Sequence, residues 1–299
     1  MPWGRRSNVA FHIGTVLIIG PGLIGGSFAL GLKASATVGR VLALDRDKAN
    51  LTQAISLGIV DAGATLEDAR HADLVMVSVP VGSFGPVLSA LQSHLGVRTV
   101  ITDVGSTKSN VVEQARQSLG LMFSRFVPGH PISGSDASGA AAASAMLFNE
   151  KRVVLTPVKE TDSGAIDMVA HAWAACGARV ERLSPMVHDR ILAVVSHLPH
   201  VLAYALVERI ARDANPDRLL DYSAGAFRDV TRIAASNPEL WRDVCLANRD
   251  SLLEEIGLYQ GVLNELATNI KSGNGGELDR FFSRARELKN RPARPGGKD

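Results

Sequence analysis

The chain has 299 residues, which is long enough for two packed domains that each have their own core. Its 46% hydrophobic and 21% charged residues are typical of a globular protein and exclude a largely disordered one. The formal net charge of +2 excludes the large basic surface that recruits nucleic acid or an anionic membrane. We therefore expect neither of these partners.

Export and membrane signals are weak in the sequence. No uninterrupted apolar run reaches the roughly 18–20 residues that span a bilayer. Arg5 and Arg6 are not followed by the apolar segment of a secretory signal, and residues 1–12 are patterned like a disordered leader. Cys176 and Cys245 cannot form a disulfide framework, which is typical of a reducing compartment. These features predict a cytoplasmic protein.

The first strong element is Thr15–Gly20, a continuous apolar run of the kind that is buried in a parallel sheet. It leads into a G-x-G-x-x-G motif at the start of an amphipathic helix, formed by Gly20, Gly22 and Gly25. In this motif glycines let the backbone turn tightly and approach a pyrophosphate at the helix N-terminus. The pattern predicts a dinucleotide site that includes Leu23 and Ile24, whereas a lone motif would predict only a tight turn.

A second predicted strand, Val41–Asp45, ends in an acidic residue twenty positions after Gly25. A carboxylate at this distance accepts hydrogen bonds from the adenosine ribose hydroxyls. Asp45 favours NAD, because the 2′-phosphate of NADP would meet its negative charge. Arg46 beside it could accommodate that phosphate, so NADP is the alternative cofactor.

Further apolar runs alternate with helical patterns, which predicts a doubly wound α/β sheet of the Rossmann type. The runs are Leu74–Val79, Thr99–Thr102, Arg125–Val127, Arg152–Leu155 and Arg179–Leu183. Val79, Pro80 and Asp103 end two of these strands, at the sheet edge where nucleotides bind in such folds. We expect all three residues to contact the cofactor.

From His188 onward the sequence shows helical patterns and no convincing strand, which predicts an all-α C-terminal domain. We place the nucleotide-binding domain at residues 13–184, the helical domain at 185–290 and a disordered tail at 291–299. One long helix carries apolar residues in steps of four and three, at Leu252, Ile256, Tyr259, Leu263, Leu266 and Ile270. Such a seam packs against a partner helix, either in the core of this domain or in a dimer interface.

Histidines and arginines that could take part in catalysis or binding occur in three places. His130 lies in the Gly/Pro-rich stretch Val127–Asp136, where we expect a loop that presents a general base. His197 and His200 are three residues apart on one helix, so they could share a face, but no third ligand at a recognisable spacing supports a metal site. Of two arginines four residues apart, Arg228 and Arg232, either could bind a carboxylate through its planar fork or be an ordinary surface charge.

Together these motifs resemble the prephenate/arogenate dehydrogenase family of tyrosine biosynthesis. They are GPGLIGGS, DVGSTK (Asp103–Lys108), GHPISGSD, SHLPH and FRDVTRIAASNPELW, and they occur in the family's order. The resemblance covers roughly residues 14–290. Many members read HPMAG or HPMFG where this chain has His-Pro-Ile-Ser-Gly, which we interpret as a packing change.

The resemblance implies roles for particular residues. It implies that His130 is the catalytic histidine, which takes the proton of the ring hydroxyl as hydride leaves, and that Ser106 orients it near the nicotinamide. It implies that Arg232 holds the ring carboxylate, and that the other substrate-binding residues are His197, His200, Trp241 and, against the side chain, Asp136. It also implies a homodimer through the helical domain, and no metal. Tyrosine is expected to inhibit, if at all, at the active site.

The sequence therefore predicts a prephenate dehydrogenase that uses NAD to convert prephenate oxidatively to 4-hydroxyphenylpyruvate and CO2. Asp136 could instead favour the ammonium group of arogenate, so an arogenate or dual-specificity cyclohexadienyl dehydrogenase is the alternative. A β-hydroxyacid dehydrogenase would need a lysine in the second domain, and there is none between residues 184 and 270. A non-catalytic NAD-sensing protein would not need His130, His200 and Arg232 together.

Overall fold

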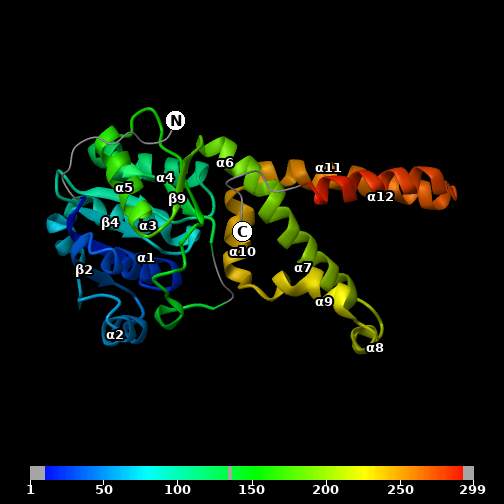
Figure 1. Cartoon of the computed structure of the whole chain (residues 1–299), viewed down its shortest axis with the longest axis horizontal. Helices are drawn as coiled ribbons and strands as arrows, with labels where there is room; N and C mark the ends of the chain where they lie inside the picture. The colour runs from blue at the N-terminus through cyan, green and yellow to red at the C-terminus, as the bar shows by residue number, and fades with distance from the viewer. Residues whose placement is uncertain (1–10, 134–136, 292–299) are drawn as a thin grey trace. The chain divides into compact units, whose positions relative to one another are not determined.

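A computed structural model of the chain describes residues 11–133 and 137–291 (Figure 1). The chain divides into two compact units. Unit 1 comprises the residues up to Asp189 together with Arg242–Ala247, and unit 2 comprises Arg190–Trp241 and the residues from Asn248 onward. This division falls five residues after the boundary that the sequence predicts, and no sequence pattern indicated that Arg242–Ala247 belongs to unit 1.

A six-stranded sheet of parallel strands forms the centre of unit 1, in the order β3-β2-β1-β4-β5-β6. This is the doubly wound order of dinucleotide-binding folds and confirms the predicted fold class. The strands are β1 (Ile13–Ile19), β2 (Val38–Leu44), β3 (Ala62–Gly63), β4 (Leu74–Val77), β5 (Val100–Asp103) and β6 (Phe126–Val127).

Helices cover both faces of this sheet, and this explains why its strands read as continuous apolar runs. In β1, Val16 and Ile18 belong to one core cluster, while Leu17 and Ile19 belong to the other. The first cluster includes side chains of α1 (Leu23–Ala34), α2 (Lys48–Ser56) and α5 (Ser163–Ala175). The second includes side chains of α3 (Phe84–Leu91) and α4 (Ser109–Leu119).

A second, three-stranded sheet holds His130 and corrects one prediction. It contains β7 (Gly129–Pro131), β8 (Arg152–Leu155) and β9 (Arg179–Arg182), in that order. His130 therefore lies in a short strand and not in a loop, because β7 pairs antiparallel with β8 and places His130 opposite Val154. The backbone that carries this histidine is held by sheet hydrogen bonds, which restricts its motion.

The rest of the described chain, after β9, is helical. The segments are α6 (Pro185–Leu192), a π-helical turn η6 (Ala193–His197), α7 (Leu198–Ala211), α8 (Pro216–Asp221), α9 (Gly225–Thr231), a 3₁₀ turn η7 (Arg232–Ala235), α10 (Pro238–Ala247), α11 (Arg249–Lys271) and α12 (Gly275–Lys289). Asn237 accepts hydrogen bonds from the backbone N–H groups of Glu239 and Leu240, so it caps α10. The predicted all-α second region is confirmed.

Unit 2 buries little of its apolar surface. Along the predicted seam of α11, Leu252 is buried, but Leu263 and Ile270 are 45% and 61% exposed.

The segments α6, η6 and α7 form one helical stretch, Pro185–Ala211, whose most apolar 18-residue window has a mean hydropathy of 1.6 and is only 28% buried. By length and composition this stretch could cross a membrane, which the sequence prediction missed because it considered uninterrupted apolar runs. A core or interface helix has the same composition.

Candidate active site

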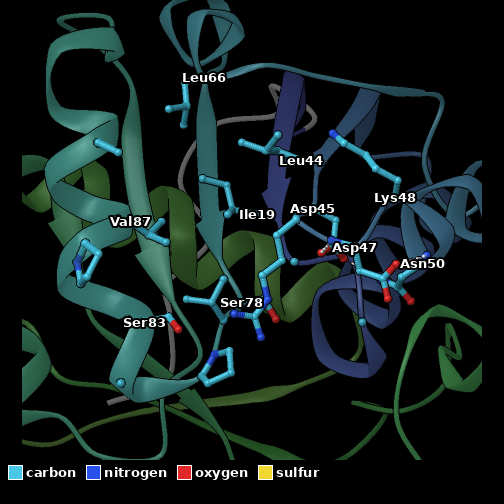
Figure 2. A pocket seen from close by; sticks show the side chains of 18 of the residues that line it. Ile19, Leu44, Asp45, Asp47, Lys48, Asn50, Leu66, Ser78, Ser83 and Val87 are labelled. Carbon is cyan, nitrogen blue, oxygen red and sulfur yellow. Dashed lines mark hydrogen bonds between the residues drawn. The ribbon is translucent and has the colours of Figure 1, made fainter.

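A cavity of about 860 Å³ opens in unit 1 where the parallel strands end (Figure 2). Six of the predicted cofactor residues line it, namely Gly20, Gly22, Asp45, Arg46, Val79 and Pro80. Figure 2 shows Asp45, Asp47 and Asn50 on one side of the cavity, and Ser83 and Val87 on the opposite side. Parallel strands place the residues that follow their carboxyl ends at one edge of a sheet, so residues distant in sequence meet here.

Glycine is required at the turn that enters this cavity. Gly20 has a positive φ of 86°, and a Cβ there would lie 2.4 Å from the backbone oxygen of Ser78. A Cβ on Gly25 would lie 2.6 Å from the backbone oxygen of Gly20. A Cβ on Gly22 would meet no protein atom within 4 Å, and Gly22 lines the cavity at the start of α1. The turn thus leaves room for a phosphate group at the helix N-terminus.

An ordered carboxylate lies at the end of β2. Asp45 accepts a hydrogen bond of 2.7 Å from the Asn50 side chain and one of 2.9 Å from the backbone N–H of Asp47. Asp47 in turn caps α2 through the N–H groups of Ala49 and Asn50. A carboxylate held in this way accepts ribose hydroxyl groups and opposes a 2′-phosphate, so the cavity fits NAD. Asn50 was not predicted from the sequence, although it follows Asp45 by only five residues.

Four predicted cofactor residues do not line the cavity. Gly25 is buried in α1. Leu23 and Ile24 form the first turn of α1 and are partly buried. Asp103 is fully buried, and its carboxylate pairs with Lys108 and accepts the backbone N–H groups of Gly105 and Gly129. Its role in the structure is to hold the chain beside His130.

The ion pair of Asp103 and Lys108 fixes the backbone immediately before His130. Lys108 is fully buried and donates to the Gly129 carbonyl at 2.7 Å, while the Gly129 N–H donates to Asp103 at 3.0 Å. Burial raises the pKa of the Asp103 carboxyl and lowers the pKa of the Lys108 ammonium, and the attraction between the two groups counters both shifts. Both peptide groups of Gly129 are therefore engaged by buried side chains.

The imidazole of His130 contacts a second histidine. His130 Nδ1 lies 2.8 Å from Nε2 of His188, and the two rings meet edge to face with centroids 5.1 Å apart. Nδ1 of His188 lies 2.9 Å from Oδ1 of Asp189. Ser106 is partly buried in the loop before α4, and in the described part of the chain the contact of His130 Nδ1 is His188 and not Ser106. The orienting role of Ser106 stays a prediction.

The carboxylate at the end of this chain of contacts is anchored at the start of α4. Asp189 accepts the backbone N–H groups of Lys108 and Ser109, each at 2.7 Å. Burial opposes charge on this group, but the hydrogen bonds from His188, Ser109 and Lys108 outweigh it and hold the pKa of Asp189 below its ordinary value. Neither His188 nor Asp189 was predicted from the sequence, because one His-Asp pair among helical residues carries no pattern.

Unit 2 contains a separate cluster of histidines and tryptophan. His197 is buried in the π-helical turn, and its Nδ1 lies 3.1 Å from the side-chain nitrogen of Asn248. His200 stacks on Trp241 with ring centroids 3.7 Å apart, and the Trp241 ring also meets His197 edge to face. A π-helical turn changes the angular spacing of side chains, and such turns are frequent at functional sites.

His200 is ordered as a neutral ring. Its Nδ1 lies 2.9 Å from the backbone oxygen of Ser196, so this nitrogen carries the proton and Nε2 is an acceptor. Burial lowers the pKa of His200, and the nearby positive charge of Arg232 lowers it further, although the contact with Ser196 opposes both. Arg232 itself is exposed at the start of η7.

Two further predictions concern Asp136 and metals. Asp136 lies outside the described residues. Within residues 11–133 and 137–291 there is no group of three or more His, Cys, Asp or Glu side chains that could hold a metal ion.

A parallel doubly wound sheet, a glycine turn open to a cavity, an ordered acid and a positioned histidine define a dinucleotide-dependent oxidoreductase. Comparison with known proteins agrees. A family model described as prephenate dehydrogenase, nucleotide-binding domain, matches residues 28–182. A second, described as prephenate dehydrogenase, dimerization domain, matches residues 184–284. The chain belongs to the prephenate dehydrogenase family, and it is an NAD-dependent oxidoreductase.

Several relatives match along nearly the whole chain. Prephenate dehydrogenase of Bacillus subtilis is 35% identical over 92% of this chain and 75% of its own length. Cyclohexadienyl dehydrogenase of Zymomonas mobilis is 36% identical over 92% of this chain and 94% of its own. The crystal structure of Aquifex aeolicus prephenate dehydrogenase in complex with hydroxyphenyl propionate and NAD⁺ superposes with a TM-score of 0.88, at 35% identity, over 95% of this chain and 99% of that one.

Proposed function

We propose that this protein is a prephenate dehydrogenase, which oxidises and decarboxylates prephenate to 4-hydroxyphenylpyruvate in tyrosine biosynthesis. The observation that carries the proposal is the position of His130 in the unit that contains the NAD cavity: its imidazole is held by His188, and the backbone before it is held by the buried Asp103–Lys108 pair. A histidine that is fixed in this way suits general-base catalysis near neutral pH. The relatives named above support the substrate.

His130 takes the proton of the ring hydroxyl in the proposed mechanism. NAD, when bound, accepts the hydride from the carbon that carries this hydroxyl. The ring carboxylate then leaves as CO2, and the electron pair of the broken C–C bond makes the ring aromatic. The ring oxygen takes back a proton from His130 to give the phenol, and the gain of aromaticity makes the reaction effectively irreversible. Within unit 1, the glycine turn and Asp45 bind and orient the cofactor, and His130 receives the proton. Positioning and proton transfer are thus the work of the protein.

Unit 2 supplies the proposed substrate-binding residues. Arg232 is the proposed clamp for the ring carboxylate, since its planar fork makes two charge-assisted hydrogen bonds. His197, His200 and Trp241 are the proposed further contacts from this unit. Two earlier residues of the chain complete the proposal, Asp136 as a substrate contact and Ser106 as the residue that orients His130. Tyrosine, which resembles the aromatic product, is a proposed inhibitor at the same residues.

Arogenate is the second candidate substrate, and the geometry of His200 favours it. Because Nδ1 donates to Ser196, neutral His200 can only accept a hydrogen bond at Nε2. The ammonium group of arogenate is a donor, whereas the keto group of prephenate is an acceptor. The relative from Zymomonas mobilis is named for cyclohexadienyl substrates, which supports dual use.

A homodimer in the cytoplasm is also part of the proposal. The family model that matches residues 184–284 is named for dimerization. Exposed apolar side chains occur on α7, α11 and α12, including Leu206, Val207, Val262, Leu263 and Phe282. Burial of such side chains against a second copy would stabilise unit 2, which has few buried residues of its own.

A two-by-two assay tests the substrate and the cofactor. Reduced nicotinamide is measured with prephenate or arogenate, each with NAD or NADP. We expect the highest turnover with prephenate and NAD, and detectable turnover with arogenate. No turnover in all four reactions, by folded protein that binds NAD, would contradict the proposed function.

A further inference from the structure

We propose that His188 and Asp189 are positioning residues that hold the proton of His130 on Nδ1, so that Nε2 of His130 carries the lone pair that acts as the base. The inference rests on the proposed function only in that His130 is its general base. It concerns two residues to which no motif of the sequence assigned a role, and its evidence lies within unit 1.

The charge of Asp189 decides which atom donates and which accepts in each hydrogen bond between Asp189, His188 and His130. This residue accepts two backbone N–H groups at the start of α4, where the helix dipole also favours a negative charge. With the low pKa described above, Asp189 is ionised at neutral pH and can only accept hydrogen bonds. Nδ1 of His188, 2.9 Å away, must therefore carry a proton and donate it.

His188 passes this constraint to His130. Its ring is fully buried and, when Nδ1 of the neutral ring carries the proton, Nε2 is an acceptor. Nε2 lies 2.8 Å from Nδ1 of His130, so Nδ1 of His130 is the donor in that contact. A neutral imidazole has one N–H, which leaves the lone pair of His130 on Nε2. Each link is a hydrogen bond of ordinary length with one consistent donor.

The arrangement fixes the ring of His130 as firmly as its backbone. Lys108 helps to hold both the ring and the backbone, because its backbone N–H binds Asp189 while its ammonium group binds the Gly129 carbonyl. When His130 takes a proton on Nε2, its ring becomes positive and keeps its Nδ1–H bond to His188. The carboxylate of Asp189, one ring further on, offsets that charge. A base that is oriented by a second group and a buried acid recurs in unrelated enzymes.

The direct test is the position of the proton on His130. Long-range 1H–15N correlation spectra of the full chain, labelled at histidine nitrogens and saturated with NAD, distinguish the two tautomers, and His130→Asn identifies the signals. We expect wild-type His130 to carry its proton on Nδ1. In His188→Phe, which cannot accept a hydrogen bond, we expect a signal from the Nε2–H form. A proton on Nε2 in the wild type would overturn the proposal, and this outcome does not depend on the folding of His188→Phe.

Kinetics provide the second arm. We expect His188→Phe to lower kcat by at least about 10-fold and at most by the roughly 10²–10⁴-fold that loss of the base itself would cost, with KM largely kept. His188→Gln offers an amide oxygen to Nδ1 of His130 and should recover most of that loss. The matched control is His71→Gln. His71 is exposed and does not belong to the hydrogen-bonded series His130–His188–Asp189, so this variant should keep wild-type kcat.

The outcomes separate this inference from the proposed function. Wild-type kcat in folded His188→Phe, or equal losses in the Phe and Gln variants, would overturn the positioning role while the dehydrogenase activity stands. Absence of wild-type activity with both substrates would contradict the proposed function, and the tautomer spectra would still decide the state of His130.

Discussion

Two pairs of histidines, one in each unit, show how differently the same side chain can be ordered. In unit 1, the ring of His130 contacts His188, which contacts the buried carboxylate of Asp189. In unit 2, His200 contacts a backbone carbonyl and stacks on Trp241. A carboxylate at the end of a hydrogen-bond chain stabilises a ring that gains a proton, whereas burial and a nearby arginine disfavour a proton. His130 is suited to act as a base, and His200 is suited to remain a neutral acceptor.

Of the variants that test this comparison, His130→Asn is expected to have the largest effect on activity. We expect kcat to fall about 10²–10⁴-fold, the usual contribution of a positioned base. Substrate binding should be largely kept, because asparagine retains a polar group of similar size. Steady-state kinetics with prephenate and NAD measure kcat and, through KM for prephenate, the effect on substrate binding. Unchanged turnover would show that His130 is not the base.

Lys108→Met tests whether unit 1 depends on buried charge. The substitution leaves the fully buried Asp103 without its ammonium partner, which typically costs about 3–5 kcal/mol of unfolding free energy. Urea denaturation of the full chain measures this loss. The double variant Asp103→Asn/Lys108→Met removes both charges and should be less destabilised than Lys108→Met. Arg116→Met, which breaks an exposed pair with Glu160, is the control and should change stability little.

Arg232→Gln tests the cationic residue of unit 2. Hydrogen bonds to charged groups contribute about 1.5–3 kcal/mol each, so loss of the clamp should raise KM for prephenate roughly 10- to 100-fold. The value of kcat should change less than in His130→Asn. Arg228→Gln, four residues earlier, is the matched control. If Arg228→Gln raised KM and Arg232→Gln did not, the carboxylate clamp would be Arg228.

The smallest expected effect is the pH dependence of substrate preference, which depends on His200. Burial first, and then Arg232, lowers the pKa of His200 from 6.5, so the ring gains its proton only at a pH below that value. Protonation removes the acceptor at Nε2 and adds a positive charge. As pH falls from about 8 to 5, we therefore expect kcat/KM for arogenate to fall relative to that for prephenate. His200→Gln should make this ratio independent of pH, and a ratio that still changed would assign the effect to another group.

The sequence determined the nucleotide-binding half of this protein well, because its signals are local. A buried strand, glycines at a fixed spacing and an acid at the end of the next strand lie within about thirty residues of one another. Gly20 needs a positive φ and Asp45 follows a strand, and both conditions are visible in the chain itself. Outside that half, the cap of Asn237 on α10 is equally local, because it requires only the residues that follow it in the chain.

The environment of His130 was decided by tertiary structure. His130, His188 and Asp189 are separated by up to 59 positions, and Asp189 reaches back 81 positions to the backbone of Lys108. No periodicity links such residues, because the antiparallel pairing of β7 with β8 and the start of α6 bring them together. Asp103 shows the same contrast between a local sequence pattern and a contact that forms only in the folded chain. Its place at the end of a strand predicted a cofactor contact, but a buried carboxylate needs a partner, and the fold provided Lys108. Sequence patterns report which residues share an element, whereas hydrogen-bond partners across elements exist only once the chain has folded.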